Sequence, residues 1–358
     1  MTDSFRIIDT GVREGRANIA FDAALIEERQ AGHVPDTIRF LRFPPTALIG
    51  RHQDLSREIN LDFCRNNGVG IVRRITGGGA IYLDEGQLGW ELVFHRSSLG
   101  VAALPELAEK ICNAAALGFK ELGVDATFRP RNDIEVDGRK ISGTGGFFDG
   151  DVLIYQGTVL VDMNPQQMVQ ALRIPEAKLA KRDLDSAAQR VVTLKELLGD
   201  EMPDIETIKG ALIRGFTEGL GISAAPGDIT ENEEALANRY FIEEIGTDEF
   251  VAEIDNPGDD HGTLAGTHTG AGGTIDSFVK LEGPTKQVLQ RALISGDFFV
   301  TPPRIVFDLE AHLAGTRIEE IDGEIDAFFN DNDIDMLSVS PEDFKASIAN
   351  ALAGARNA

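Results

Sequence analysis

The stretch RRITGGGAIYLDEG, residues 73–86, places three consecutive glycines between two arginines and an apolar run. Short segments with strand character, GIVRRI and AIYL, flank the glycines. Three adjacent glycines cost roughly 2–3 kcal/mol of folding free energy relative to alanine, because glycine gives up more backbone freedom than other residues. We therefore expect the bare backbone of this loop to have a role that offsets the cost.

Two explanations account for these glycines. A tight turn or bulge between the two strands would need backbone conformations that glycine adopts easily. Alternatively, backbone without Cβ atoms can approach a phosphate closely and direct several N–H groups toward it. The arginines favour the second explanation. Because neighbouring side chains of a strand point to opposite faces, one guanidinium of Arg73 and Arg74 is placed to hold an anion beside the loop.

The composition is that of a globular protein. The chain has 358 residues, of which 42% are hydrophobic and 26% charged, and this length allows two domains. No apolar run reaches the length of a membrane span, and the N-terminus MTDSFRIIDTG lacks the regions of a signal peptide. The two cysteines, Cys64 and Cys112, follow no metal or redox spacing. These features predict a cytoplasmic protein that does not bind membranes.

The net charge of −25 is distributed unevenly along the chain. Residues 201–358 contain 10 Lys and Arg against 31 Asp and Glu, whereas residues 1–200 contain 24 against 28. The first part can attract an anion locally, but the acidic remainder cannot neutralise phosphates, so no nucleic acid partner is expected. A high-salt or alkaline habitat and a specific partner both remain as explanations of the acidic surface.

Hydrophobic periodicity predicts an α/β (α+β) fold, with a mixed sheet and flanking helices, over residues 1–245. In the stretch NDIEVDGRKISG, Asp137-Gly138 supplies the positive φ angles of a two-residue hairpin turn. The apolar segment 151–163 is long enough to be a central strand. Residues 246–273, rich in Gly, Asp, Thr and Pro, are expected to form a flexible linker. Two paired strands and two helices then predict a small α+β accessory domain over 274–358.

Lys140, in GRKISG, is a second candidate. A lysine just after a turn commonly points into solvent, but this one is preceded by Asn132-Asp133 and followed by the flexible SGTGG. A cation, an acid able to hold Mg²⁺ and two glycine loops could together handle a nucleotide phosphate and a carboxylate. P-loop, dinucleotide-binding, serine-hydrolase and zinc motifs are absent from the sequence.

Together these segments resemble the lipoate-protein ligases, the two-domain form of the biotin/lipoate ligase catalytic-domain family. RRITGGGAIYLDEGQ resembles their R-R-x-[ST]-G-G-G-A-V-[FY]-H-D-x-G-N signature. RNDIEVDGRKISGTG is similar to their N-D-[LI]…G-[RK]-K-[VI]-[SA]-G-[ST]-A segment. LIGRHQDLSREIN, YQGTVLVDMN and QRVVTLKELL resemble three further motifs, in family order.

The resemblance implies an enzyme that activates lipoate with ATP and Mg²⁺ to lipoyl-AMP. The lipoyl group then passes to a lysine of an acceptor protein, such as a lipoyl domain, the glycine-cleavage H-protein or a similar lipoate-binding protein. Lys140 would be the catalytic residue, because it would neutralise the charge that develops in both steps, and Asp133 would also hold Mg²⁺. The resemblance further implies that substrate or nucleotide is bound by Arg74, Thr76, Gly77, Gly78, Gly79, Ala80, Ile81, Tyr82, Gln87, Asn132, Asp133, Ser142, Gly143, Thr144, Gly157 and Thr158. Ile81 and Phe147 could hold the dithiolane tail or belong to the core.

The sequence departs from the family pattern at four positions. Two family histidines are Leu83 and Gln156 here, an asparagine is Gln87, and an alanine is Gly145. These changes bear on the choice of acyl chain or acceptor more than on reaction type. The alternative is an octanoyl or lipoyl transferase that acts from an acyl carrier or another lipoyl protein through a nucleophilic cysteine. Neither cysteine adjoins the glycine loop or Lys140 in sequence. The G-R-G-R-x-x-R loop of biotin ligases is absent, and a non-catalytic sensor would not need the lysine.

Overall fold

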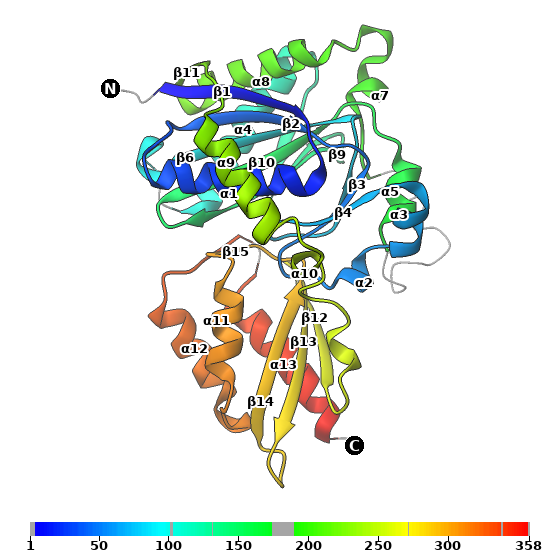
Figure 1. Ribbon diagram of the computed structural model, residues 1–358, viewed down its shortest axis with the longest axis vertical. Coiled ribbons are helices and arrows are strands. Elements are labelled where there is room, and N and C mark those ends of the chain that lie inside the picture. The colour runs from blue at the N-terminus through cyan, green and yellow to red at the C-terminus, as the bar shows by residue number, and fades with distance from the viewer. Residues whose placement is uncertain are drawn as a thin grey trace.

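The computed structural model describes residues 4–100, 103–130, 132–173, 190–270, 272–337 and 339–356. The chain forms a larger N-terminal body and a narrower C-terminal body that extends from it (Figure 1). The N-terminal end lies on the larger body, and the C-terminal end lies near the tip of the narrower one. Among the described residues, no helix has the length and apolar character needed to cross a membrane.

The larger body is built on a mixed sheet, which confirms the predicted fold class. Within the described ranges this sheet has eight strands in the order β11-β1-β2-β6-β10-β9-β8-β7. β11, β1 and β2 run parallel to one another, and the other neighbours are antiparallel. As predicted, the long apolar segment is a central strand, β10. The strands are β1 (Ser4–Val12), β2 (Thr37–Arg42), β6 (Gln87–His95), β7 (Thr127–Arg129), β8 (Asp133–Val136), β9 (Arg139–Asp149), β10 (Val152–Leu160) and β11 (Ser223–Pro226).

Helices cover both faces of this sheet. α4 (Leu104–Glu121) and α8 (Ile205–Leu220) pack against each other and bury Trp90, Phe119 and Phe216 in the largest apolar core. α1 (Gly15–Gln30) and α9 (Glu231–Glu243) cover the opposite face. Because side chains of a strand alternate between faces, each central strand contributes to both layers.

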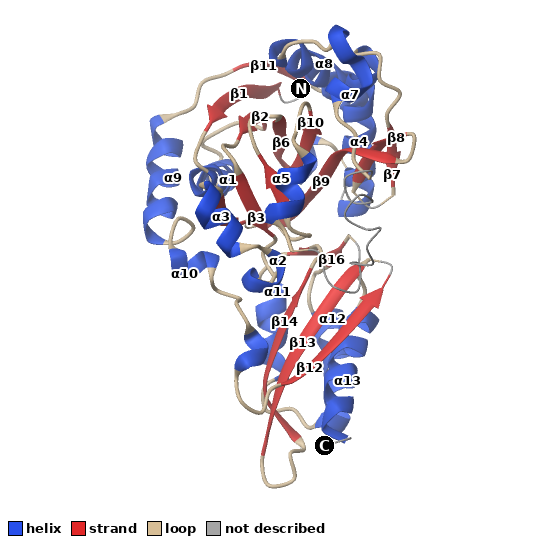
Figure 2. Cartoon of the chain, turned by 90° about the vertical axis from the view of Figure 1, so that its right-hand side faces the viewer, coloured by secondary structure: helices blue, strands red, loops and turns tan. Residues whose placement is uncertain are grey.

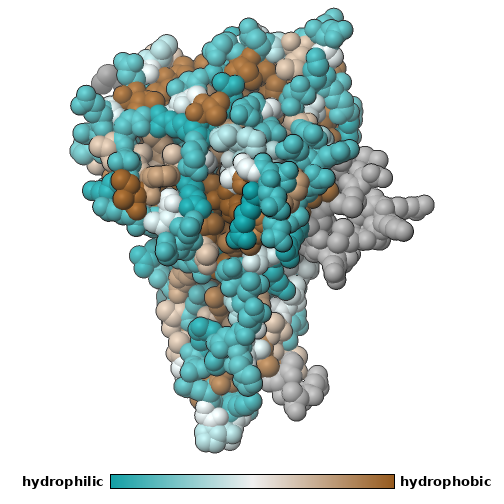
Figure 3. Space-filling view, turned by 45° about the vertical axis from the view of Figure 1, so that its right-hand side comes forward, coloured by the Kyte–Doolittle hydropathy of each residue, from teal (hydrophilic) through white to brown (hydrophobic). Residues whose placement is uncertain are grey.

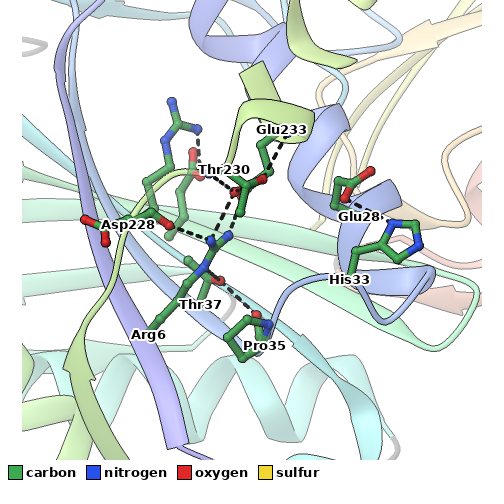
Figure 4. Close-up of polar contacts among 10 residues, drawn as sticks. Arg6, Glu28, His33, Pro35, Thr37, Asp228, Thr230 and Glu233 are labelled. Carbon is green, nitrogen blue, oxygen red and sulfur yellow. Dashed lines mark hydrogen bonds and ion pairs between the residues drawn. The ribbon is translucent and has the colours of Figure 1, made fainter. Parts of the chain in front are cut away.

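An ion pair attaches α9 to the sheet (Figure 4). The guanidinium of Arg6, on β1, pairs with the Glu233 carboxylate and donates to the Asp228 carbonyl oxygen at 3.0 Å and to Thr37 Oγ1 at 2.9 Å. Glu233 also accepts from the Thr230 backbone N–H at 2.7 Å, which completes a capping box at the start of α9. The two Nη atoms of this buried arginine thus fix the start of α9 to β1, while Nε bonds to the neighbouring strand β2.

A second, three-stranded sheet carries the glycine loop. It has the order β4-β3-β5 and consists of β3 (Thr46–Ile49), β4 (Gly70–Arg73) and β5 (Ile81–Leu83). The three glycines span the connection from β4 to β5. Short helices adjoin this sheet, namely α2 (Leu55–Glu58), α3 (Leu61–Asn67) and α5 (Pro165–Ala171), and α7 (Leu194–Leu198) follows later in the chain.

The predicted hairpin is confirmed. β8 and β9 pair antiparallel around Asp137 and Gly138, whose φ angles of 51° and 76° are those of a two-residue turn. The register shifts between Ile134 and Glu135, so the strand is bulged close to Lys140.

The C-terminal body is a three-stranded antiparallel sheet with helices packed on it (Figure 2). Its core is formed by apolar side chains of the sheet and of all three helices. The paired strands β13 and β14 and the helices α11 and α13 follow the sequence prediction, whereas helix α12 was not predicted. The elements are β12 (Leu264–Gly270), β13 (Gly273–Glu282), β14 (Val288–Gly296), β15 (Val300–Thr301), α11 (Ile305–Leu313), α12 (Ile321–Asp331), β16 (Asp335–Met336) and α13 (Pro341–Arg356).

The segment predicted as a linker, residues 246–273, contains regular structure. α10 (Asp248–Val251) packs on the larger body, and β12 pairs with β13, so the sheet of the C-terminal body begins before residue 274. Arg73 is completely buried and donates to carbonyl oxygens of Val251 at 2.9 Å and Ile254 at 3.0 Å. These bonds, which sequence composition does not reveal, hold the first part of the segment in place. The division of the chain into domains stays a prediction.

Candidate functional site

A cavity of about 350 Å³ lies between the large sheet, the small sheet and α5. Apolar side chains gather on the surface where the larger body narrows toward the C-terminal one (Figure 3). The sequence prediction and the cavity agree at fourteen positions, which come from both glycine segments and both sheets. These are Arg74, Thr76, Gly77, Gly79, Ala80, Ile81, Tyr82, Gln87, Asn132, Lys140, Gly143, Thr144, Gly157 and Thr158.

Small and apolar residues in register form part of the cavity floor. Leu41 on β2 lies opposite Gly89 on β6, which in turn lies opposite Thr158 on β10. The Gly143 backbone N–H donates to Thr158 Oγ1 at 3.4 Å, which continues this row onto β9. A Cβ at Gly89 would approach Leu41 Cδ2 to 2.8 Å, so glycine leaves room for that side chain.

Lys140 stands over one end of this floor. Its ammonium nitrogen Nζ lies 2.8 Å from Asp133 Oδ1. A Cβ placed on Gly143 would approach Nζ to 2.5 Å, so only glycine at this position leaves room for the ammonium group. The main chain is held from the other side, because the Lys140 N–H donates to Arg190 O at 2.8 Å and its carbonyl accepts from Val192 at 2.9 Å. Lys140 is therefore a positioned, half-exposed cation at the cavity.

Arg74 orders the glycine loop from within. Its Nη2 donates to the carbonyl oxygens of Gly77 and Gly79, both at 3.0 Å, and its Nε donates to Thr76 Oγ1 at 3.2 Å. Burial lowers the pKa of this guanidinium to about 10. With its carbonyls turned inward to a cation, the loop can direct N–H groups outward. Of the two arginines, Arg74 is thus the one beside the loop, and Arg73 faces α10.

Three predicted residues do not line the cavity. Asp133 lies behind Lys140 as its ion-pair partner, and Gly78 is covered by the C-terminal body. Ser142 is fully buried opposite Ile134 on β8, on the side of the sheet away from Gly143. Of the two candidates for the acyl tail, Ile81 lines the cavity and Phe147 belongs to the core under α1.

Comparison with known families decides what this arrangement is. The model described as "Lipoyl protein ligase A/B catalytic domain" matches residues 14–217, which include the glycine loop, Lys140 and the whole cavity floor.

The chain belongs to this family.

Curated relatives in the family carry both activities in their names. Octanoyltransferase LipM of Symbiobacterium thermophilum is 30% identical over 273 residues, 70% of this chain and 98% of that protein. Lipoate-protein ligase A subunit 1 of Thermoplasma acidophilum is 28% identical over 246 residues, 66% of this chain and 91% of that protein. The protein is therefore an enzyme of the lipoate ligase and octanoyltransferase family.

Solved structures show the same fold. A structure of lipoate-protein ligase A bound with ATP is 27% identical with a TM-score of 0.62, over 70% of this chain and 99% of that one. The bipartite T. acidophilum ligase, solved in a study with its E2 lipoyl domain, is 26% identical with the same TM-score, over 70% and 97%. P. falciparum LipL1 in complex with lipoate is 18% identical with a TM-score of 0.70, over 92% and 94%. That last likeness extends the shared fold into the C-terminal body.

Within this lipoate ligase fold, the C-terminal body contributes a residue that no local sequence pattern predicts. Phe299, between β14 and β15, lines the cavity. Its ring lies against the backbone of Gly78 and Gly145, and a Cβ on either glycine would overlap with it. The Gly78 N–H donates to the Phe298 carbonyl oxygen at 2.9 Å. The family alanine at this position is replaced by Gly145 because the Cβ of an alanine would collide with the Phe299 ring.

We expect Gly145→Ala to lower the free energy of unfolding by about 1–3 kcal/mol, because overpacking forces the ring or the backbone to move. In a Phe299→Ala background the same change should cost less than about 0.5 kcal/mol, since its collision partner is gone. Urea unfolding of the four proteins of this cycle measures the difference. An equal cost in both backgrounds would mean that Phe299 does not explain the glycine.

Neither cysteine of the sequence lines the cavity itself, although Cys112 lies directly behind the lining residue Thr144. Cys64 packs in the apolar cluster under the small sheet, and burial raises its pKa to about 11. Cys112, on α4, is completely buried, and its Sγ lies 3.4 Å from Thr144 Oγ1 and 3.5 Å from Tyr155 OH. Burial raises the pKa of this thiol too. Both environments disfavour the thiolate that a nucleophilic cysteine needs.

Acidic side chains from both bodies meet beside α2. Asp54 and Glu58 come from the larger body, and Asp276 and Asp297 come from the C-terminal one. Burial and then these three carboxylates raise the pKa of Glu58 from 4.5 to about 7. The folded protein thus binds more protons than the unfolded chain between these values. The stability that protonated Glu58 provides is fully present below pH 4.5 and is lost as the pH rises through 7.

Glu58→Gln should therefore raise the free energy of unfolding by about 2 kcal/mol at pH 8 and change it little at pH 4.5. Thermal unfolding at both pH values provides the measurement. Glu109→Gln, at an exposed position of α4 beyond its first turn, is the matched control and should have no effect at either pH. A Glu58→Gln effect of the same size at both pH values would contradict this account.

Proposed function

We propose that this family member is an ATP-dependent lipoate-protein ligase, which forms lipoyl-AMP and then transfers the lipoyl group to a lysine of an acceptor protein. The observation that carries the proposal is the pairing of a cation, Lys140, with a bare loop ordered by Arg74 in a cavity that neither cysteine lines. An adenylation site needs donors and positive charge around a carboxylate and a phosphate. A thioester route needs an accessible thiolate instead.

Each residue has a defined task in this proposal. The Lys140 ammonium would lie beside the carboxylate oxygen that attacks the α-phosphate, and would stabilise negative charge there in both half-reactions. Asp133 keeps that ammonium in position through their 2.8 Å ion pair. Backbone N–H groups of the glycine loop other than that of Gly78, which donates to the Phe298 carbonyl oxygen, would bind phosphate oxygens. The attacking lysine amine of the acceptor displaces AMP from the mixed anhydride, and the new amide bond retains the acyl carbonyl.

Magnesium fits this site only as a partner of the nucleotide. Within the described ranges no cluster of three or more His, Cys, Asp or Glu side chains is arranged to hold a metal ion. Mg²⁺ commonly binds through phosphate oxygens, waters and one or two carboxylates. The ion would neutralise phosphate charge when bound. Asp133, the carboxylate expected to hold it, pairs with Lys140 and does not line the cavity, so phosphate oxygens and waters would supply most of the ligands.

A lipoyl domain is the proposed acceptor. The relative from T. acidophilum was solved in a study of a ligase and its E2 lipoyl domain. The half-exposed position of Lys140 leaves the reacting carbon within reach of an incoming lysine side chain. The compartment that we propose is the cytoplasm.

A second candidate is transfer of an octanoyl group, which is the activity that the relative from S. thermophilum is named for. The donor in this alternative would be an acyl carrier. The full-length protein should be incubated with a lipoyl domain and either lipoate, ATP and Mg²⁺ or octanoyl carrier protein alone. Mass spectrometry of the domain identifies the group that is added. The proposal expects a lipoyl adduct only with ATP. An octanoyl adduct that forms without ATP would replace the proposal with the transferase.

A further inference from the structure

A polar row crosses the sheet beneath the cavity. Arg39 on β2 lies opposite Glu91 on β6, and Glu91 lies opposite Gln156 on β10. These three residues are called the polar row below. Asn18 and Asp22, one helical turn apart on α1, lie against the row from above. Arg39, Glu91, Asn18 and Asp22 are buried completely or almost so.

The donors of Arg39 are all turned into the protein. Nη1 donates to Asp22 Oδ1 at 2.6 Å and to Glu91 Oε2 at 3.0 Å. Nη2 donates to Asn18 Oδ1 at 2.8 Å, and Nε donates to Thr10 Oγ1 at 3.1 Å. Burial and the neighbouring Glu91 carboxylate raise the pKa of Asp22 well above its usual value. With Asp22 protonated, the positive charge of Arg39 is balanced by the single negative charge of Glu91.

Gln156 connects this cluster to the cavity. Its Nε2 donates to Asp22 Oδ2 at 2.8 Å and to Glu91 Oε1 at 2.7 Å. Glu91 Oε1 belongs to the ionised carboxylate and can only accept, so the NH₂ group of the amide must face it, and the same nitrogen then also lies against Asp22 Oδ2. Both of its N–H donors are then used. Gln156 lines the cavity, so its carbonyl oxygen Oε1 remains available to accept a hydrogen bond from a ligand.

The separation of Lys140 and Gln156 along the cavity suits a medium-length acyl chain. The Lys140 ammonium lies over Gly143, whose N–H meets Thr158 Oγ1. Gln156 is two residues from Thr158 on β10, on the same side and about 7 Å away. A chain whose carboxylate lies at Lys140 therefore passes Gln156 in its distal half, where Glu91 and Asp22 also reach the lining.

We propose that Gln156 determines acyl specificity by selecting a chain with a hydrogen-bond donor, a thiol or hydroxyl, in its distal half over an unsubstituted octanoyl chain. This inference rests on the proposed function, because it assumes that the carboxylate binds at Lys140. A plain alkyl chain would displace water from Gln156 Oε1 and leave the acceptor unpaired, which is costly in a buried site. Lipoate in its dithiol form carries S–H donors there, although these are weak, and a hydroxyl would bind more strongly.

Equilibrium binding of free acids to the full-length protein tests this selection without turnover. Calorimetry should compare octanoate with 6- and 8-hydroxyoctanoate, and dihydrolipoate with oxidised lipoate, the dithiol being kept reduced by a phosphine. We expect one hydroxyoctanoate to bind about tenfold more tightly than octanoate, about 1.4 kcal/mol, and dihydrolipoate to bind more tightly than lipoate. Octanoate binding as tightly as both hydroxy acids would overturn the inference.

A variant locates the effect. Gln156→Met keeps the length of the side chain but removes its acceptor oxygen. In this variant octanoate and the hydroxyoctanoates should bind with about equal affinity. An affinity ratio unchanged from wild type would overturn the role of Gln156. The wild-type comparison stands alone if this variant does not fold. If no free acid binds and acyl transfer proceeds from a carrier without ATP, the proposed function has failed. In that case the rates of transfer of carrier-bound octanoyl and 8-hydroxyoctanoyl groups are compared. Faster transfer of the hydroxyoctanoyl group supports the inference, and equal rates overturn it.

Discussion

Replacing Lys140 with methionine should lower kcat/KM for adenylation by about 10²–10³-fold, which is the usual effect of losing one group that stabilises transition-state charge. Methionine keeps most of the side-chain volume above Gly143 but removes the ammonium that pairs with Asp133. Because Lys140 is half-exposed, the midpoint of unfolding should change little. Release of pyrophosphate in the presence of lipoate and ATP measures the rate.

Lys120→Met is the matched control. Lys120 is exposed near the end of α4, far along the chain from both glycine segments, and its replacement should leave the rate unchanged. Lys140→Arg tests whether charge alone is sufficient. The guanidinium is wider than an ammonium, and the space above Gly143 is tight, so arginine should restore little activity. Turnover of Lys140→Met within about threefold of wild type would remove this lysine from the mechanism.

Arg73→Met should have the largest effect on stability, a loss of about 3–5 kcal/mol in the free energy of unfolding. The guanidinium donates to backbone carbonyl oxygens of two separate segments, and without it those buried acceptors lose their partners. Arg73 is completely buried, and this burial lowers the pKa of its guanidinium to about 10. The carbonyl groups belong to Gly50, Arg51, Gln53, Phe250, Val251 and Ile254.

Urea unfolding measures this loss, and limited proteolysis shows where it acts. Cleavage should appear first around residues 250–260, because that segment is what Arg73 holds to the larger body. Arg65→Met, at an exposed position of α3, serves as the control and should change neither measurement. An Arg73→Met protein with an unchanged midpoint of unfolding would show that these bonds contribute no net stability.

Much of the site could be predicted because its signals are local. The glycine run between two strands, the Asp137-Gly138 turn and Lys140 just after it all depend on neighbours in sequence, and the structure brings the glycine run and Lys140 to one cavity. Alternation along the strand says that Arg73 and Arg74 point to opposite faces but not which of them faces the loop. The choice of Arg74 comes from the family resemblance alone.

The remaining features depend on which strands become neighbours. Arg39, Glu91 and Gln156 are far apart in sequence, and only the register of β2, β6 and β10 aligns them. Phe299 reaches the cavity from the C-terminal body, so no local pattern marks it. The family resemblance implies that Ser142 lies in the pocket, but the alternation along β9 turns it away from Gly143.

The central claim is that this family member makes an acyl adenylate. Isotope exchange between pyrophosphate and ATP tests it most directly, because exchange requires reversible adenylation and needs no acceptor protein. The account predicts exchange that depends on lipoate, occurs without a lipoyl domain and is lost in Lys140→Met. No lipoate-dependent exchange, together with ATP-independent acyl transfer from a carrier protein by the same preparation, would contradict it.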